Sequence, residues 1–387
     1  MFDRKNRIYR GLRGEEGMTR NKHEKLSIAE KRLLTGGVLL AASAVLTIAA
    51  GRSSRMAEWY SAHIYPLFVG TVGRFAGVFS FSLSELALYV LIVLLAGSFI
   101  HAVASAVRNK CGGPVILQWA SGLFLTVSVL VLLYVLNCGI NYRRVSFSEK
   151  SDIQMVEYTV EDLKQTCMWL TEELNARTGL VNRDEAGVMK LTGEDERAAV
   201  TAMEQLGEQY PALSGYYPQP KSLLVSEILS WQGITGIYSP FTVEANYNED
   251  MTAYNIPFTA CHELSHLRGF MQEEEANFIA FLACKDAAGE DFQYSGYLMG
   301  WIYSTNALKR MDAKAADEVR FGLNQQVETD LKANSRFWNS YEGTVAEVSN
   351  KVNDTYLKVN GQSDGVQSYD RMVDLIVSYH LEKDGIF

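Results

Sequence analysis

The sequence has few cysteines, and their placement excludes two kinds of site. Five cysteines occur among 387 residues, an odd number with no Cys-x-x-Cys pair. Such a set provides neither a disulfide framework nor a paired-thiolate metal motif. We expect Cys261, which precedes a histidine, to pack as a small apolar side chain. The five are Cys111, Cys138, Cys167, Cys261 and Cys284.

The chain also lacks internal repeats, low-complexity linkers and an arginine-rich patch with interleaved aromatics, so no nucleic-acid partner is expected. Basic charge gathers at the start instead. Residues 1–32 carry ten Lys/Arg against five Asp/Glu, whereas the whole chain has a net charge of −9. We predict a basic cytoplasmic tail over residues 1–32, with Met1 and Met18 both open as its first residue.

Three long apolar runs follow the tail. A helix needs roughly 20 residues to cross a bilayer, and each run is long enough. The first and last runs contain no charged residue, and the middle run is interrupted only by His101. We therefore predict a membrane domain over residues 33–144. The runs are Leu33–Gly51, Leu86–Val107 and Val115–Leu136.

The distribution of Lys and Arg predicts the orientation of these spans. The basic tail and the short loop with Arg108 and Lys110 fall on one side, which the positive-inside rule makes cytoplasmic. Three crossings then place the chain after Tyr142 outside the cytoplasm. Arg143 and Arg144 argue mildly the other way. The aromatic segment 59–81 is expected at the outer membrane interface or docked on the soluble domain.

Beyond residue 145 the sequence becomes polar and periodic, and we predict an extracytoplasmic domain over residues 145–387. Apolar spacing predicts helices at Val160–Thr178 and Thr192–Tyr210. The β-branched and aromatic run Ile234–Val243 predicts one or two short strands, which Pro240 confines to a sheet edge. That edge is a candidate site for pairing with an extended peptide. The remainder is expected to be mainly helical.

The segment His262-Glu263-Leu264-Ser265-His266 carries the chemistry. On a helix, this spacing puts His262 and His266 one turn apart on the same face, where both rings can hold one zinc ion. Glu263 is the expected general base for a water activated by zinc. Pro257 favours a helix start, and Gly269 favours its end.

A catalytic zinc needs a third protein ligand and one open position. The acidic run Glu273-Glu274-Glu275 begins the next predicted helix and supplies candidates. Glu273 is favoured because Asn277 follows one turn later and can support a metal ligand. Glu275 is the second choice, and Glu274 should face elsewhere. The alternative is a solvated acidic helix start.

These residues resemble a known pattern. Together with the three apolar runs, the motifs are similar to an uncharacterised family of bacterial membrane proteins that carry an HExxH domain. The element Glu-x-x-Ala-Asn also resembles the Glu-x-x-Ala-Asp helix of membrane-associated gluzincin peptidases, from which Asn277 departs. The resemblance implies a zincin-like fold, a zinc ion and Glu273 as third ligand. The segments that carry it are Tyr238–Asn246, Pro257–Phe270, Glu273–Phe278 and Tyr294–Tyr297.

We therefore expect a mainly α-helical protein with three transmembrane helices and a zincin-like α+β domain with a small edge-strand element. The expected activity is zinc-dependent hydrolysis of a peptide or protein substrate at the cell membrane. A membrane sensor with a non-catalytic zinc domain is the alternative. Tyr294 or Tyr297 can donate to an oxyanion or simply pack. Substrate identity and oligomeric state stay open.

Overall fold

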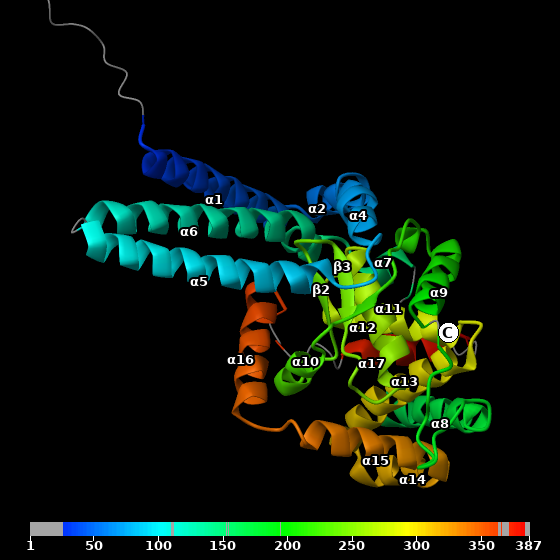
Figure 1. The fold of residues 1–387 in the computed structure, drawn as a ribbon. Helices are drawn as coiled ribbons and strands as arrows, with labels where there is room; N and C mark the ends of the chain where they lie inside the picture. Colours follow the sequence, from blue (N-terminus) through cyan, green and yellow to red (C-terminus); the bar gives the residue numbers. More distant parts are fainter. Residues whose placement is uncertain are drawn as a thin grey trace, which may run out of the picture.

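The computed structural model describes residues 26–383, apart from 110–111, 152, 154, 194, 363–364 and 366–370. The prediction of a mainly helical chain with a small β element is confirmed. Figure 1 shows three long helices extending from one side of a helical domain that contains a short sheet. Of the predicted basic tail, residues 1–25 lie outside the described part.

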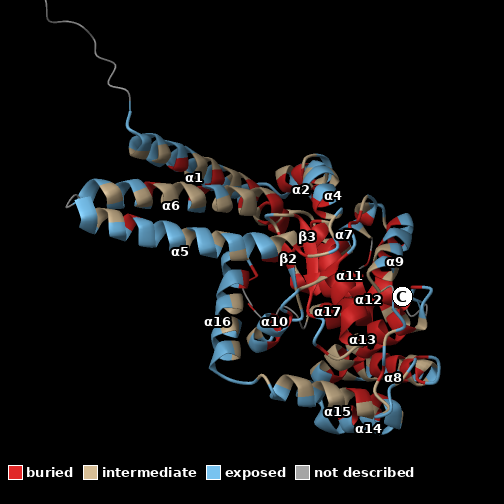
Figure 2. Cartoon of the chain, viewed as in Figure 1, coloured by how far each residue is buried: buried red, intermediate tan, exposed pale blue. Residues whose placement is uncertain are grey.

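Three helices are long and apolar enough to cross a membrane, as the sequence predicted. They are α1 (Ile28–Arg52), α5 (Leu83–Asn109) and α6 (Gly112–Tyr134). Few of their residues are buried in the isolated chain, where most are exposed or intermediate (Figure 2), as is expected where lipid is the natural solvent. The third span continues through a π-helical turn, Val135–Gly139, and a 3₁₀ turn, Asn141–Arg143.

The segment between the first two spans docks on the domain, which was one of its two expected placements. Its short helices are α2 (Ser54–His63), α3 (Tyr65–Phe68) and α4 (Arg74–Ala76). Tyr65 is fully buried, and its hydroxyl donates to the Leu267 carbonyl at 2.9 Å. This segment is therefore part of the core around the candidate site.

The C-terminal half consists of helices packed around α11 and α12, whose residues are all buried (Figure 2). The predicted helices α8 and α9 appear close to their expected bounds, and α12 begins at Glu273 as predicted. The helices are α7 (Phe147–Lys150), α8 (Val160–Arg177), α9 (Asp195–Gln209), α10 (Glu227–Gln232), α11 (Asn255–Leu267), α12 (Glu273–Lys285), α13 (Glu290–Met311), α14 (Ala313–Phe321), α15 (Gln325–Asn339), α16 (Thr344–Val359) and α17 (Met372–Lys383).

A three-stranded sheet lies beside α11, in the order β1-β3-β2. The strands are β1 (Lys221–Ser222), β2 (Gly236–Ser239) and β3 (Glu244–Tyr247). The outer strand β2 pairs antiparallel with β3 and ends immediately before Pro240. The predicted edge position is thus correct, because proline cannot donate a ladder hydrogen bond.

Buried charges join this sheet to the second span. Lys221 pairs with Glu244 at 2.6 Å, and both side chains are buried. The Glu244 carboxylate in turn accepts hydrogen bonds from the backbone N–H groups of Leu83 and Ser84, at the start of α5. Glu244 therefore caps a membrane helix from the neighbouring strand, which fixes the sheet relative to the span.

Candidate metal centre

The helix α11 presents His262 and His266 side by side. Their rings lie 4.5 Å apart, nearly perpendicular at 85°. The helix starts at Asn255, two residues before Pro257, so proline occupies the first turn, where its missing N–H costs nothing. Both histidine side chains are about nine-tenths buried, so the fold holds them away from bulk water.

The end of α11 orients His266. Gly269 has φ +91°, the Phe270 N–H donates to the Ser265 carbonyl, and the Gly269 N–H donates to the His266 carbonyl. This is the Schellman arrangement that glycine favours after a helix. It brings the Phe270 carbonyl to 2.8 Å from His266 Nδ1. A proton on Nδ1 leaves Nε2 free to bind a metal.

Glu273, the first residue of α12, completes the cluster. Its Oε2 lies 3.3 Å from His262 Nε2 and 3.7 Å from His266 Nε2. One ligand atom from each residue lies within 4.8 Å of the others. Ligands about 2.1 Å from one tetrahedral zinc are about 3.4 Å apart. The spacing in this cluster therefore fits a zinc ion.

The two histidines and Glu273 strongly affect one another's pKa values. Burial acts to lower the pKa of His266, but the Glu273 carboxylate outweighs it and raises that pKa to about 9. Burial acts in turn to raise the pKa of Glu273, while the two histidines hold it well below its usual range. Burial, followed by the charge of His266, lowers the pKa of His262, while Glu273 and to a smaller extent Asn277 act in the opposite direction. A metal cation would take the place of the proton shared by these groups.

Glu263 faces the edge strand. Burial raises the pKa of its carboxyl to about 8, and its Oε2 has no hydrogen-bond partner. The neighbouring strand position is Gly236, where a Cβ atom would lie 2.5 Å from Glu263 Oε1. The strand thus approaches this carboxylate as closely as a residue without a side chain allows.

The other two glutamates of the acidic run point elsewhere. Glu274 pairs with Arg371 at 3.1 Å and accepts a hydrogen bond from Gln362. Glu275 accepts a hydrogen bond of 2.6 Å from the Phe147 N–H, and burial raises the pKa of Glu275 to about 8. Of the three, the structure brings Glu273 to the histidines.

The other candidates occupy the domain core or its surface. The Tyr294 hydroxyl donates to Asp330, and the Tyr297 ring lies beneath the Arg177 guanidinium. These contacts match the packing interpretation of both tyrosines. The Arg268 guanidinium, at the end of α11, lies over the Tyr217 ring.

Sequence reasoning missed the residues that surround the cluster from the membrane side. Arg144, just beyond the third span, donates to the Arg268 carbonyl at 3.2 Å and lies over the Phe270 ring. Asn137 donates to the Pro240 carbonyl at 2.8 Å, beside β2. Tyr65 bonds to the Tyr238 hydroxyl at 2.8 Å. No local pattern marks them, because their partners lie about a hundred residues or more away.

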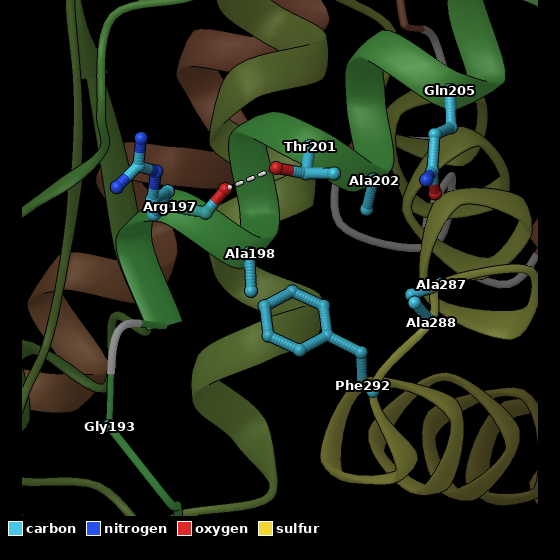
Figure 3. A pocket seen from close by; sticks show the side chains of 10 residues that line it. Gly193, Arg197, Ala198, Thr201, Ala202, Gln205, Ala287, Ala288 and Phe292 are labelled. Carbon is cyan, nitrogen blue, oxygen red and sulfur yellow. Dashed lines mark hydrogen bonds between the residues drawn. The ribbon is translucent and has the colours of Figure 1, made fainter.

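A cavity of about 250 Å³ lies away from the cluster, between α9 and the start of α13 (Figure 3). Four of its ten lining residues are alanines, and Phe292, Thr201 and Arg197 are among the others. In Figure 3 the Thr201 hydroxyl bonds to the Arg197 carbonyl within α9. This cavity contains none of the candidate metal-binding side chains.

Fold and site together define a mainly helical protein with three candidate membrane spans and a buried cluster of two histidines and one glutamate. Residues 60–377 match the family described as protein of unknown function (DUF3810), and the chain belongs to that family. No curated protein and no solved structure matches the chain.

Proposed function

We propose that this protein is a membrane-anchored zinc-dependent hydrolase that cleaves amide bonds in a peptide or protein. The observation that carries the proposal is the cluster of His262, His266 and Glu273, with Glu263 beside it. Two histidines and one glutamate are a frequent ligand set of catalytic zinc, because three protein ligands leave one position open. The resemblance to gluzincin peptidases supports the same assignment.

The chain's own residues supply the remaining parts of the mechanism. A bound zinc ion would activate a water molecule and polarise a carbonyl group. Glu263, held in a buried position with one free carboxylate oxygen, would accept the proton of that water and deliver it to the leaving amine. Burial raises the pKa of this carboxyl, which favours a group that can both accept and return a proton.

The edge of β2 is the proposed position for an extended substrate. Its partner β3 occupies one side only, and Gly236 brings the strand against Glu263. An added strand would satisfy backbone hydrogen bonds along the outer edge. This would hold a peptide carbonyl next to the metal cluster and orient it for attack.

Two measurements test the proposal: the zinc content of the purified full-length chain, and its turnover of substrates in cells. We expect stoichiometric zinc in the wild type, loss of zinc in His262→Ala, and retained zinc in Glu263→Gln. Turnover is followed as cleavage products that disappear from cellular peptides when Glu263→Gln replaces the wild type. We expect a loss of about 10²–10⁴-fold, as is typical for a general base.

Glu275→Gln is the matched control, because this buried glutamate lies two residues after Glu273 on α12 and bonds to Phe147 instead of the cluster. It should keep both zinc and activity. Wild-type protein without zinc would overturn the metal assignment. Zinc retained in wild type, Glu263→Gln and Glu275→Gln but lost in His262→Ala, with no cleavage product that depends on Glu263, would instead favour a sensor with a non-catalytic zinc domain.

A further inference from the structure

The helix α16 carries an exposed apolar stripe. Val345, Val348, Val352 and Val359 are between 53 and 76% exposed. Tyr356 lies in the same row, but its ring packs against Tyr134 and Tyr142 at the end of the third span. Their spacing of three, four, four and three residues places all five on one side of the helix. Isolated exposed apolar residues are common, but a continuous row along four turns indicates a surface that is covered in the native setting.

The remaining faces of α16 are of different character. Ala346, Ser349 and Leu357 face inward, and α16 packs against α10 along this side. The charged residues Glu347, Lys351 and Lys358 occupy a third side, about a third of a turn around the helix from the valines. The helix therefore separates a packed face, an apolar face and a charged face, as helices at a membrane interface do.

A second group of exposed apolar residues lies in and just before α10. Leu224, Val225, Ile228 and Trp231 are all between 42 and 69% exposed. Tryptophan is the residue most characteristic of the membrane–water interface. Since α10 and α16 pack against one another, the two groups belong to neighbouring elements.

Both elements are fastened to membrane spans at the ends nearest the domain. The N–H groups of Leu224 and Val225 donate to the Glu85 carboxylate, in the first turn of α5, at 2.7 and 3.0 Å. At the other element, Asn360 accepts a hydrogen bond of 2.7 Å from the Tyr134 hydroxyl at the end of α6. Figure 1 shows α16 running crosswise to α5, below its domain-proximal end.

We propose that α10 and α16 form a membrane-resting surface, whose occupant is the lipid bilayer. The domain-proximal ends of the spans mark the bilayer surface. The first turn of α5 bonds to the segment before α10, and the last residue of α6 bonds to the end of α16. The valines of α16 would enter the boundary between headgroups and acyl chains, while its charged side faces water.

Photocrosslinking of the full-length protein in phosphatidylethanolamine–phosphatidylglycerol vesicles tests the surface. A benzophenone amino acid is placed at Val348 or Val352, and at Asn350 or Lys351 as matched controls on the charged side. We expect lipid adducts by mass spectrometry at the two valine positions and few at the controls. Equal adducts at all four positions, or adducts with protein instead of lipid at the valines, would overturn the proposal.

Tryptophan quenching gives a second measurement that does not perturb α16. Brominated lipids should quench wild-type fluorescence more than that of Trp231→Phe, because the exposed indole is removed. Trp301→Phe, which removes a buried indole, should leave the quenchable signal unchanged. Identical quenching of wild type and Trp231→Phe contradicts lipid contact at α10. Neither measurement depends on zinc, so the surface stands or fails independently of the proposed function.

Discussion

At the scale of single residues, Gly236 shows how closely the edge strand and Glu263 are fitted. A Cβ atom there would lie 2.5 Å from Glu263 Oε1 and 2.7 Å from Thr259 Cγ2. It would also lie 2.9 Å from the Asn246 backbone oxygen. The glycine is needed for space, and its neighbours include backbone that cannot move aside cheaply.

Gly236→Ala should therefore displace β2 from α11. We expect a loss of about 1–3 kcal/mol in the free energy of unfolding, together with reduced turnover, because Glu263 or the strand must shift. Gly179→Ala is the control, since open space surrounds that position and a change within about 0.5 kcal/mol is expected. Denaturant unfolding in detergent measures both, and equal stability of the two variants would contradict the steric argument.

Asp195 gives a prediction about pH. Burial, followed by the charges of Glu196 and Asp291, raises the pKa of Asp195 to about 6. A carboxyl whose pKa is raised by folding favours the folded state at low pH, and this contribution is lost as pH rises through 6. Asp195→Asn should thus stabilise the protein at pH 7 by about 1 kcal/mol, after allowance for partial exposure. Thermal unfolding should show little gain at pH 4, and an equal gain at both pH values would argue against a charge effect.

At the scale of elements, the turn between α11 and α12 joins the histidines to Glu273. Gly269 has φ +91°, and a Cβ there would lie 3.1 Å from Arg144 Nη1. This left-handed residue directs the Phe270 carbonyl to His266. The conformation of one turn thereby determines the orientation of a metal-binding side chain.

Gly269→Ala should cost about 1–2 kcal/mol in stability and weaken zinc binding by about 10–100-fold, the usual effect of losing a partner of a metal ligand. Gly233→Ala is the matched control, because Gly233 also has a positive φ, of 69°, and ends α10 away from the cluster. It should lose similar stability and keep its zinc affinity. Zinc competition titrations measure both affinities. Equal zinc affinities of the two variants would show that the Gly269 turn does not orient His266 for zinc binding.

Local patterns made much of this fold predictable. Apolar length marked the three spans, and periodicity marked α8 and α9. The HExxH spacing placed His262 and His266 together. Other features depend on distant contacts that no local pattern records. The choice between Glu273 and Glu275 depends on how α12 is rotated, because residues two apart on a helix point in nearly opposite directions.

The same limit hid the residues that close the site and the surface at α16. Tyr65 and Arg144 reach the end of α11 from more than a hundred residues away. The valine row of α16 has ordinary helical spacing, which in a sequence is typical of a helix packed on a core. Only the packing of Leu357 and Ala346 shows that the valines face outward.

At the scale of the whole molecule, the membrane segments and the candidate site form one unit. Residues from α3 and from the exit of the third span bond to β2 and to the end of α11. Buried Glu244 joins the sheet to the second span. The candidate spans therefore hold the cluster close to the end of the segments that can cross a bilayer. Under the proposed function, the substrate would be presented at the bilayer surface. Cleavage products that depend on Glu263 should accordingly come from membrane-attached chains.

The side of the membrane on which the domain lies is the last prediction. The basic tail and the loop after α5 favour the cytoplasm for the far ends of the spans, so the domain should lie outside it. A cysteine at Asn350 should react with an impermeant maleimide in intact protoplasts. A cysteine at Asn109, at the far end of α5, should react only after permeabilisation. The reverse pattern would place the domain in the cytoplasm and redirect the search for substrates to cytoplasmic chains at the inner membrane surface.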